Sequence, residues 1–321
     1  MAAIWLTRSW FVTAGNPTGF EARRIDYVLD SSSINKNVDC RHFSIAVHFK
    51  HMTVCHTFLE MIPMTASIRA LNNSHDLTWQ TKVDLAAAYR LIHRHGLDDS
   101  IYTHISARLP GGHDRFLINP YGMRFEEVKA STLVTVDIDG KVIEDPLGLN
   151  INPAGFTIHS AIHSARPDVV CVLHTHTVAG VAVSCQQDGL LPLNQWSMQF
   201  HGCIAYHTYE GIALDLDERQ RLIADLGDKS VLILRNHGLL TCGRSVSEAF
   251  KLMFNLERSC RAQLAIQSAG SPVVQAPPGI AEKTAGQYSR GYDKIEAGNG
   301  PDIEWEAFKR MLERTDSDYR T

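Results

Sequence analysis

The sequence predicts a single α/β domain, and three observations support that fold class. Segments with helical periodicity and segments with strand periodicity alternate along residues 78–270. The 321 residues are 44% hydrophobic and 21% charged, which is ordinary for a globular protein that buries a sizeable core. Neither a G-x-G-x-x-G fingerprint nor a P-loop occurs in the sequence. We therefore expect a domain that binds neither a dinucleotide nor ATP through those motifs.

Several segments have the apolar spacing of helices. The first begins at Thr78, a suitable N-cap, and ends at Gly96, while Pro167 ends the second. A long helix follows Ser245 and closes at Gly270, because Ser favours the start of a helix and Gly its end. The predicted helices cover residues 78–96, 153–167, 216–227, 245–270 and 304–315.

Short runs rich in β-branched residues lie between these helices and predict strands. The clearest is VVCVLHTHT at 169–177, a buried strand. Asp139 and Gly140 stand between two apolar runs, which is typical of a hairpin turn. The predicted strands lie within residues 102–109, 115–120, 132–143, 169–177 and 230–236.

The two ends of the chain differ from its middle. Residues 1–63 mix Trp, Arg, Ser and Asn without sustained periodicity, and they lack the continuous apolar core of a signal peptide and the Arg-rich pattern of a transit peptide. We predict a poorly ordered N-terminal extension over 1–63, one domain over 64–270, and a C-terminal tail with a short helix over 271–321.

Charge and cysteine usage exclude several classes of protein. The formal net charge is only −4, whereas a general nucleic-acid-binding protein has a strong basic excess. No run approaches the roughly 18 apolar residues of a membrane span. The seven cysteines are scattered and never form a C-x-x-C pair, so we expect no disulfide framework and a reducing, cytoplasmic compartment.

The 16 histidines include three that predict a metal site. His174 and His176 are two residues apart on one strand, so their side chains leave the same face. His237 ends another predicted strand, and three such histidines with one position open form catalytic zinc sites. Exposed strand-end histidines are the alternative. The pair His159 and His163 has helical zinc spacing, but no Glu follows His159, so we assign that pair a structural role.

Two adjacent carboxylates, Glu126 and Glu127, follow a Pro-Tyr-Gly turn. A Glu beside a metal bound by three histidines can act as a general acid or base. The alternative is a solvated helix start, where acidic residues are favoured.

Three blocks of sequence, in this order, resemble the class II aldolase/adducin family, and especially its adducin-head branch, over residues 78–270. They are NPYGMRFEEVKASTLVTVDIDGKV, NPAGFTIHSAIHSARPDVVCVLHTHTVAGVAVS and LILRNHGLLTCG. The resemblance implies an αβα three-layer domain with a central mixed, mostly antiparallel sheet. It also implies a divalent metal, with zinc favoured, that is held by His174, His176 and His237. The acid/base residue of the family maps to Glu126, four residues after Gly122, with Glu127 as the fallback.

The segments that bind phosphate in sugar-phosphate aldolases of the family differ here. The first loop reads Thr103-His104-Ile105-Ser106, and the turn reads Asn119-Pro120-Tyr121-Gly122. Bulky groups partly replace small donors, so a carboxylate or keto acid is favoured over a phosphorylated substrate. The predicted substrate-binding residues are His104, Ser106, Arg108, Asn119 and Gly122.

The resemblance implies a metal-dependent carbon–carbon lyase, which is an aldolase, decarboxylase or epimerase acting on a small hydroxy or keto compound through a metal-stabilised enediolate or enolate. It further implies a homotetramer, for which LPLNQWSMQF at 191–200 is a candidate interface loop. The alternative is a non-catalytic, adducin-like interaction module with an actin- or spectrin-type partner. Three intact histidines favour the enzyme.

Overall fold

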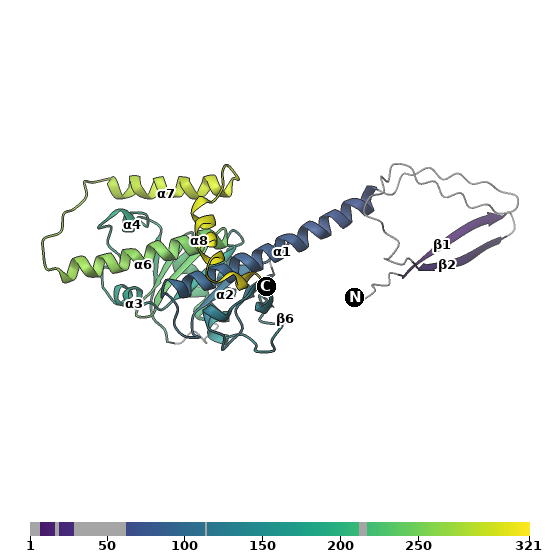
Figure 1. The fold of residues 1–321 in the computed structure, drawn as a ribbon, viewed down its shortest axis with the longest axis horizontal. Helices are drawn as coiled ribbons and strands as arrows, with labels where there is room; N and C mark the ends of the chain where they lie inside the picture. The colour runs from purple at the N-terminus through teal and green to yellow at the C-terminus, as the bar shows by residue number, and fades with distance from the viewer. Residues whose placement is uncertain (1–6, 17–18, 29–61, 113, 212–216) are drawn as a thin grey trace. The chain divides into compact units, whose positions relative to one another are not determined.

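The computed structural model describes residues 7–16, 19–28, 62–112, 114–211 and 217–321 (Figure 1). The chain divides into two compact units, Met1–Met61 and Ile62–Thr321. In the first unit, β1 (Thr7–Asn16) pairs with the antiparallel strand β2 (Gly19–Val28). The remainder of the predicted 1–63 extension, up to residue 61, lies outside the described residues.

The second unit contains an eight-stranded sheet in the order β6-β5-β4-β3-β7-β10-β9-β8. Its neighbouring strands are antiparallel except for the parallel pair β8 and β9, so the mixed, mostly antiparallel sheet is confirmed. The strands are β3 (His104–Arg108), β4 (Arg115–Ile118), β5 (Val134–Asp137), β6 (Val142–Glu144), β7 (Cys171–Thr175), β8 (Ile204–His207), β9 (Val231–Leu234) and β10 (Gly238–Gly243).

Helices cover both faces of this sheet and complete the three layers. On one face lie α1 (Ile62–Arg94), α3 (Val178–Ser184) and α6 (Val246–Ser268). On the other lie α2 (Pro153–Ala165) and α5 (Glu218–Leu226). The remaining helices are α4 (Gln195–Met198), α7 (Ile280–Glu296), α8 (Ile303–Glu313) and the short 3₁₀ turns η2 (Phe125–Glu127), η3 (Ala130–Thr132) and η4 (Ser317–Arg320).

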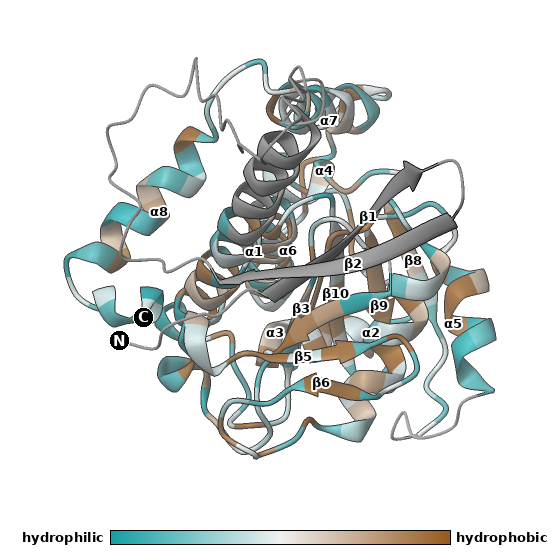
Figure 2. Ribbon diagram, turned by 90° about the vertical axis from the view of Figure 1, so that its right-hand side faces the viewer, coloured by the Kyte–Doolittle hydropathy of each residue, from teal (hydrophilic) through white to brown (hydrophobic). Residues whose placement is uncertain are grey.

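Successive side chains of the central strands point to opposite faces of the sheet, which separates the apolar core from the polar site. In β3, Ile105 and Ala107 pack into the core beneath α1 and α6, so the three polar residues of that strand face α2. In β7, Leu173 joins the same core, and His174 points to the α2 face. In Figure 2 the strands at the centre of the sheet are coloured largely hydrophobic, whereas α5 and α8 carry both hydrophobic and hydrophilic residues.

The first helix is longer than the sequence analysis predicted. It begins at Ile62 rather than at Thr78, which lies in its interior. Pro63 stands in the first turn, where its missing N–H costs nothing, and no other Pro or Gly interrupts the helix before Arg94. Favourable N-cap residues also occur inside helices, so Thr78 was a misleading start signal.

The residues after α6 pack against the domain. The side chains of Trp305, Leu312 and Tyr319 are buried in the same core as α1 and α6. Arg90 of α1 forms ion pairs with Asp316 and Asp318 at 2.6 and 3.3 Å. The short helix predicted near the C-terminus is α8, whereas α7 was not predicted. No helix among the described residues is both long and apolar enough to cross a membrane.

Candidate metal centre

The three predicted histidines meet where β7 and β9 end and β10 begins. His174 lies in β7, His176 follows that strand, and His237 stands between β9 and β10. Strand β10 pairs with both β7 and β9, so it brings the three residues together. Gly238 permits this close approach, because an added Cβ would lie 2.4 Å from the carbonyl oxygen of Thr175.

The Nε2 atoms of the three rings converge on one point. The distance from His174 Nε2 to His176 Nε2 is 2.8 Å, and that from His176 Nε2 to His237 Nε2 is 2.9 Å. His174 Nδ1 donates a hydrogen bond to the carbonyl of Leu239 at 2.9 Å, and His176 Nδ1 donates one to Asp99 Oδ2 at 2.9 Å. Both Nε2 atoms are therefore acceptors whose lone pairs face one another, and a cation at this point would relieve their repulsion. The donor set fits a divalent metal such as zinc.

Burial keeps His174 and His237 neutral, which is the form that binds metals. Desolvation lowers the pKa of His174 well below its usual value, and the neighbouring His176 and His237 lower it further. Desolvation, followed by the charge of His176, lowers the pKa of His237 to about 4. Because His174 and His237 are neutral near pH 7, metal binding at these two positions requires no proton release.

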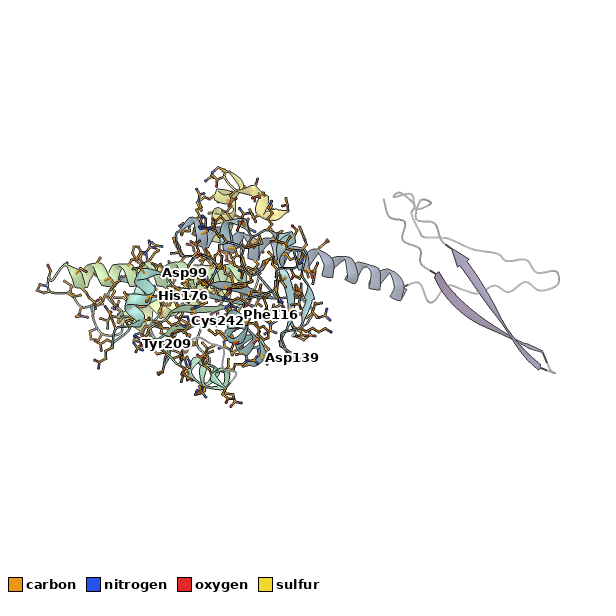
Figure 3. All side chains as sticks on the ribbon, turned by 90° about the horizontal axis from the view of Figure 1, so that it is seen from below. Asp99, Phe116, Asp139, His176, Tyr209 and Cys242 are labelled. Carbon is orange, nitrogen blue, oxygen red and sulfur yellow. The ribbon has the colours of Figure 1, made fainter. Side chains whose placement is uncertain are left out.

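The triad opens into a cavity of about 470 Å³. Tyr102, Tyr121 and Tyr209 line it, together with the first turn of α2. The ring of Tyr209 lies against that of His237, with centroids 6.0 Å apart. In Figure 3, Asp99 and His176 are labelled side by side, as their hydrogen bond requires. The cavity can therefore hold a small molecule against the three imidazoles.

His104 lines this cavity as predicted, and its environment keeps it neutral. The side chain is 3% exposed, and it stands opposite His174 in the register of β3 and β7. Desolvation lowers its pKa to about 4, although a hydrogen bond with Asn119 opposes that effect. Its ring occupies the space left by Gly155 of α2, where an added Cβ would lie 2.2 Å from His104 Cδ2.

We predict that Gly155→Ala destabilises the domain by about 1–3 kcal/mol, because the new methyl group must displace the buried His104 ring. Urea unfolding monitored by circular dichroism measures the change. The matched control is Gly286→Ala in α7, where the added Cβ would lie 3.4 Å from Arg290 Nη1. That variant is expected to be neutral or stabilising, because Ala favours helix interiors. Equal stability of the two variants would contradict the prediction.

Ser106 and Arg108, which were predicted to bind substrate, do not line the cavity. Ser106 Oγ lies 2.7 Å from His159 Nδ1 and 2.8 Å from His163 Nε2, so it joins β3 to α2. The guanidinium of Arg108 donates to the backbone carbonyls of His163, Arg166 and Val169, at and beyond the end of α2. The structure therefore gives both residues a role in holding α2. His159 and His163 make structural contacts with Ser106, the kind of role assigned to them because no Glu follows His159.

Asn119 and Gly122 lie on either side of Tyr121 in the sequence, and Tyr121 lines the cavity. Asn119 is 2% exposed, and its Oδ1 lies 2.9 Å from the hydroxyl of Tyr89. Gly122 has φ +92°, a conformation that favours glycine, and it forms the turn after Tyr121. Neither residue lines the cavity, although both were predicted to bind substrate.

Glu126 lies in a second cluster and does not line the cavity. Arg124 Nε donates to its Oε1 at 2.6 Å, and its Oε2 lies 3.2 Å from His93 Nδ1. His93, Asp98 and Glu126 bring their ligand atoms within 4.8 Å of one another. Glu127 accepts a hydrogen bond from the backbone N–H of Arg124 at 2.8 Å and so caps η2. The positions of Asp99 and Tyr209 at the cavity were not predicted, since no sequence motif distinguishes these residues.

The comparisons with known proteins identify the family. The model for the Class II Aldolase and Adducin N-terminal domain matches residues 83–264. The chain belongs to this family. A candidate class 2 aldolase of Pseudomonas aeruginosa is 51% identical over 242 residues, which cover 75% of this chain and 92% of that protein. An aldolase II superfamily protein of Pseudomonas syringae is 54% identical, with a TM-score of 0.70 over 76% of this chain and 96% of that structure.

Other proteins similar to this chain are named either as adducins or as aldolases. The alpha-adducin of Rattus norvegicus is 42% identical over 74% of this chain, which spans only 33% of that protein. The L-fuculose 1-phosphate aldolase of Glaciozyma antarctica is 28% identical, with a TM-score of 0.65 over 76% of this chain and 93% of that structure. Proteins named as aldolases and proteins named as adducins are thus both similar to this chain.

Proposed function

We propose that this protein is a metal-dependent carbon–carbon lyase of the class II aldolase type, acting on a small hydroxy or keto compound. The observation that supports it is the convergence of three histidine Nε2 atoms at the floor of a cavity. A bound divalent metal, with zinc favoured, supplies a Lewis acid that stabilises negative charge on a substrate oxygen. Aldol cleavage, decarboxylation and epimerisation all need that stabilisation.

The protein's own groups bind the substrate and move its proton. The three tyrosines and His104 line the space for the substrate, beside the first turn of α2. Glu126 is the proposed acid/base. Its Oε2 lies 3.2 Å from His93 Nδ1, while Arg124 holds its Oε1. Proton transfer therefore requires the carboxylate to leave Arg124 and turn toward the cavity.

The substrate that fits best is an unphosphorylated hydroxy or keto acid. Among the described residues that line the cavity there is no Lys or Arg, and His104 is neutral near pH 7. A phosphate dianion needs cationic or multiple N–H donors. The first turn of α2 offers few of them, because Pro153 has no N–H and Asn152 accepts the N–H groups of Ala154 and Phe156.

We further propose the homotetramer typical of the family, with residues 191–200 at the interface. In that segment Trp196 is 38% exposed and stacks on Arg258.

A non-catalytic interaction module with an actin- or spectrin-type partner is the second candidate function. It is favoured by the 42% identity to alpha-adducin. Under that function the protein would lack turnover on every hydroxy and keto acid tested, and it would co-sediment with actin or spectrin filaments. The metal centre favours the enzyme, because an interaction surface needs no converging imidazoles.

Metal analysis tests the proposed centre. We expect about one zinc or similar ion per chain in the purified protein, and we expect His174→Ala to lose more than nine-tenths of it, since one of three neutral imidazole ligands is removed. Elemental analysis after dialysis measures the content. His201→Ala is the matched control, because His201 is exposed and outside the cavity. Full occupancy in a His174/His176/His237 triple alanine variant would refute the site.

A further inference from the structure

Two consecutive aspartates lie between α1 and β3, and each contacts a different histidine. Asp98 Oδ2 accepts a hydrogen bond from His93 Nδ1 at 2.9 Å, beside Glu126. Asp99 Oδ2 accepts one from His176 Nδ1, also at 2.9 Å. The backbone carbonyl of Asp99 accepts a hydrogen bond from the N–H of Tyr102 at 2.9 Å, which forms a turn at the cavity edge. Neighbours in sequence therefore serve two separate clusters.

His176 needs an external support more than His174 does. His174 belongs to β7, is 3% exposed and donates its Nδ1–H to a backbone carbonyl of the adjacent strand. His176 lies beyond the last residue of β7, and its side chain is 22% exposed. No ladder hydrogen bond of β7 reaches it. Its ring orientation therefore depends on a side-chain partner, and that partner is Asp99, 77 positions earlier in the sequence.

We propose that Asp99 is a positioning residue for the metal ligand His176. The carboxylate accepts the Nδ1–H, which holds the ring in the tautomer whose Nε2 lone pair faces His174 and His237. A hydrogen bond from a metal-binding imidazole to a carboxylate also raises the basicity of the ligand nitrogen. This inference rests on the proposed metal centre but not on the proposed reaction.

Zinc affinity of the full chain tests the role of Asp99. The apparent Kd is measured by competition with a chromophoric chelator at pH 7.5. Asp99→Ala is expected to weaken binding about 10–100-fold, the usual effect of losing such a partner. Asp99→Asn is expected to restore most of the affinity, because the amide oxygen still accepts the Nδ1–H. Asp98→Ala, the matched control, removes the same charge from the adjacent position and is expected to change the Kd less than twofold.

Three outcomes would overturn the proposal. The first is an unchanged Kd in Asp99→Ala. The second is an equal loss of zinc affinity in Asp98→Ala, which would indicate an effect of the whole loop. The third is a loss of affinity in Asp99→Asn as large as in Asp99→Ala, which would indicate attraction by charge alone. Thermal unfolding monitored by circular dichroism verifies that each variant is folded.

The tautomer of His176 gives a readout that needs neither metal nor turnover. In metal-free protein, ¹⁵N-resolved NMR of the imidazoles is expected to show the proton of His176 on Nδ1. Asp99→Ala should shift the proton toward Nε2, and Asp99→Asn should return it. A tautomer unaffected by Asp99→Ala refutes the positioning role. If the tautomer and Kd results hold while no hydroxy or keto acid is turned over, the proposed reaction fails and the positioning role stands.

Discussion

Glu126→Gln lowers turnover by about 10²–10⁴-fold and leaves the metal content unchanged. This is the expected result if Glu126 is the acid/base, because a carboxamide of the same size cannot accept the substrate proton. Glu126 lies outside the group formed by His174, His176 and His237, so its replacement should not release a metal bound there. Turnover is measured on a panel of hydroxy and keto acids, with metal content determined on the same samples.

Glu127→Gln is the matched control for this experiment. Glu127 accepts a hydrogen bond from the backbone N–H of Arg124, a contact that the amide oxygen of Gln can also make. In a 3₁₀ turn such as η2, adjacent side chains point about 120° apart, so only one of the two carboxylates can turn to the cavity. A larger effect at Glu127 would move the acid/base by one residue. No effect at either position would refute the proposed proton transfer.

The second large effect is a loss of stability in mild acid. Three buried histidines outside the triad have lowered pKa values, chiefly because of desolvation: His104 to about 4, His163 to about 3, and His159 well below its usual value. In the unfolded chain they titrate near 6.5. Between pH 6.5 and about 4 the unfolded state therefore binds protons that the folded state does not, and stability falls as the pH falls.

Each such histidine contributes a slope of at most about 1.4 kcal/mol per pH unit in this window. Urea unfolding of the metal-free protein at pH 7.5, 6.5, 5.5 and 4.5 measures it. The pKa of Asp168 lies below its usual value because of Arg166, so this carboxylate contributes only at lower pH. His163→Gln should reduce the slope by about one histidine's share, whatever its effect on stability at pH 7.5. A slope unchanged by that substitution would contradict the explanation.

The metal site illustrates what local sequence can predict. His174 and His176 share a strand with β-branched neighbours, so their common face follows from the period of a strand alone. His237 follows a second strand and precedes a glycine, which indicates a sharp turn. These signals are short-range, and the three histidines do converge. The strands β3, β4, β5, β7 and β9 and the helices α2 and α6 were likewise predicted close to their observed bounds, whereas β8 and β10 were not predicted.

The prediction of substrate-binding residues was less successful, because their positions depend on contacts that no local pattern encodes. Ser106 and Arg108 alternate with the core residues of β3 just as His104 does, so the sequence gives no reason to separate them. Only the position of α2 separates them: its first turn reaches His104 at the cavity, and its later turns cover Ser106 and Arg108. The placement of Glu126 with Arg124 and His93 likewise depends on how η2 packs against α1.

The sequence by itself determined the alternation of helices and strands, the three converging histidines and the family, because each depends on residue types at fixed short spacings. Tertiary structure alone decided that β10 lies between β7 and β9, that Asp99 supports His176, and that the C-terminal helix joins the core. Those contacts join residues far apart in the chain. Their stability comes from burial and from pairing of polar groups in the assembled domain, which no local segment contains.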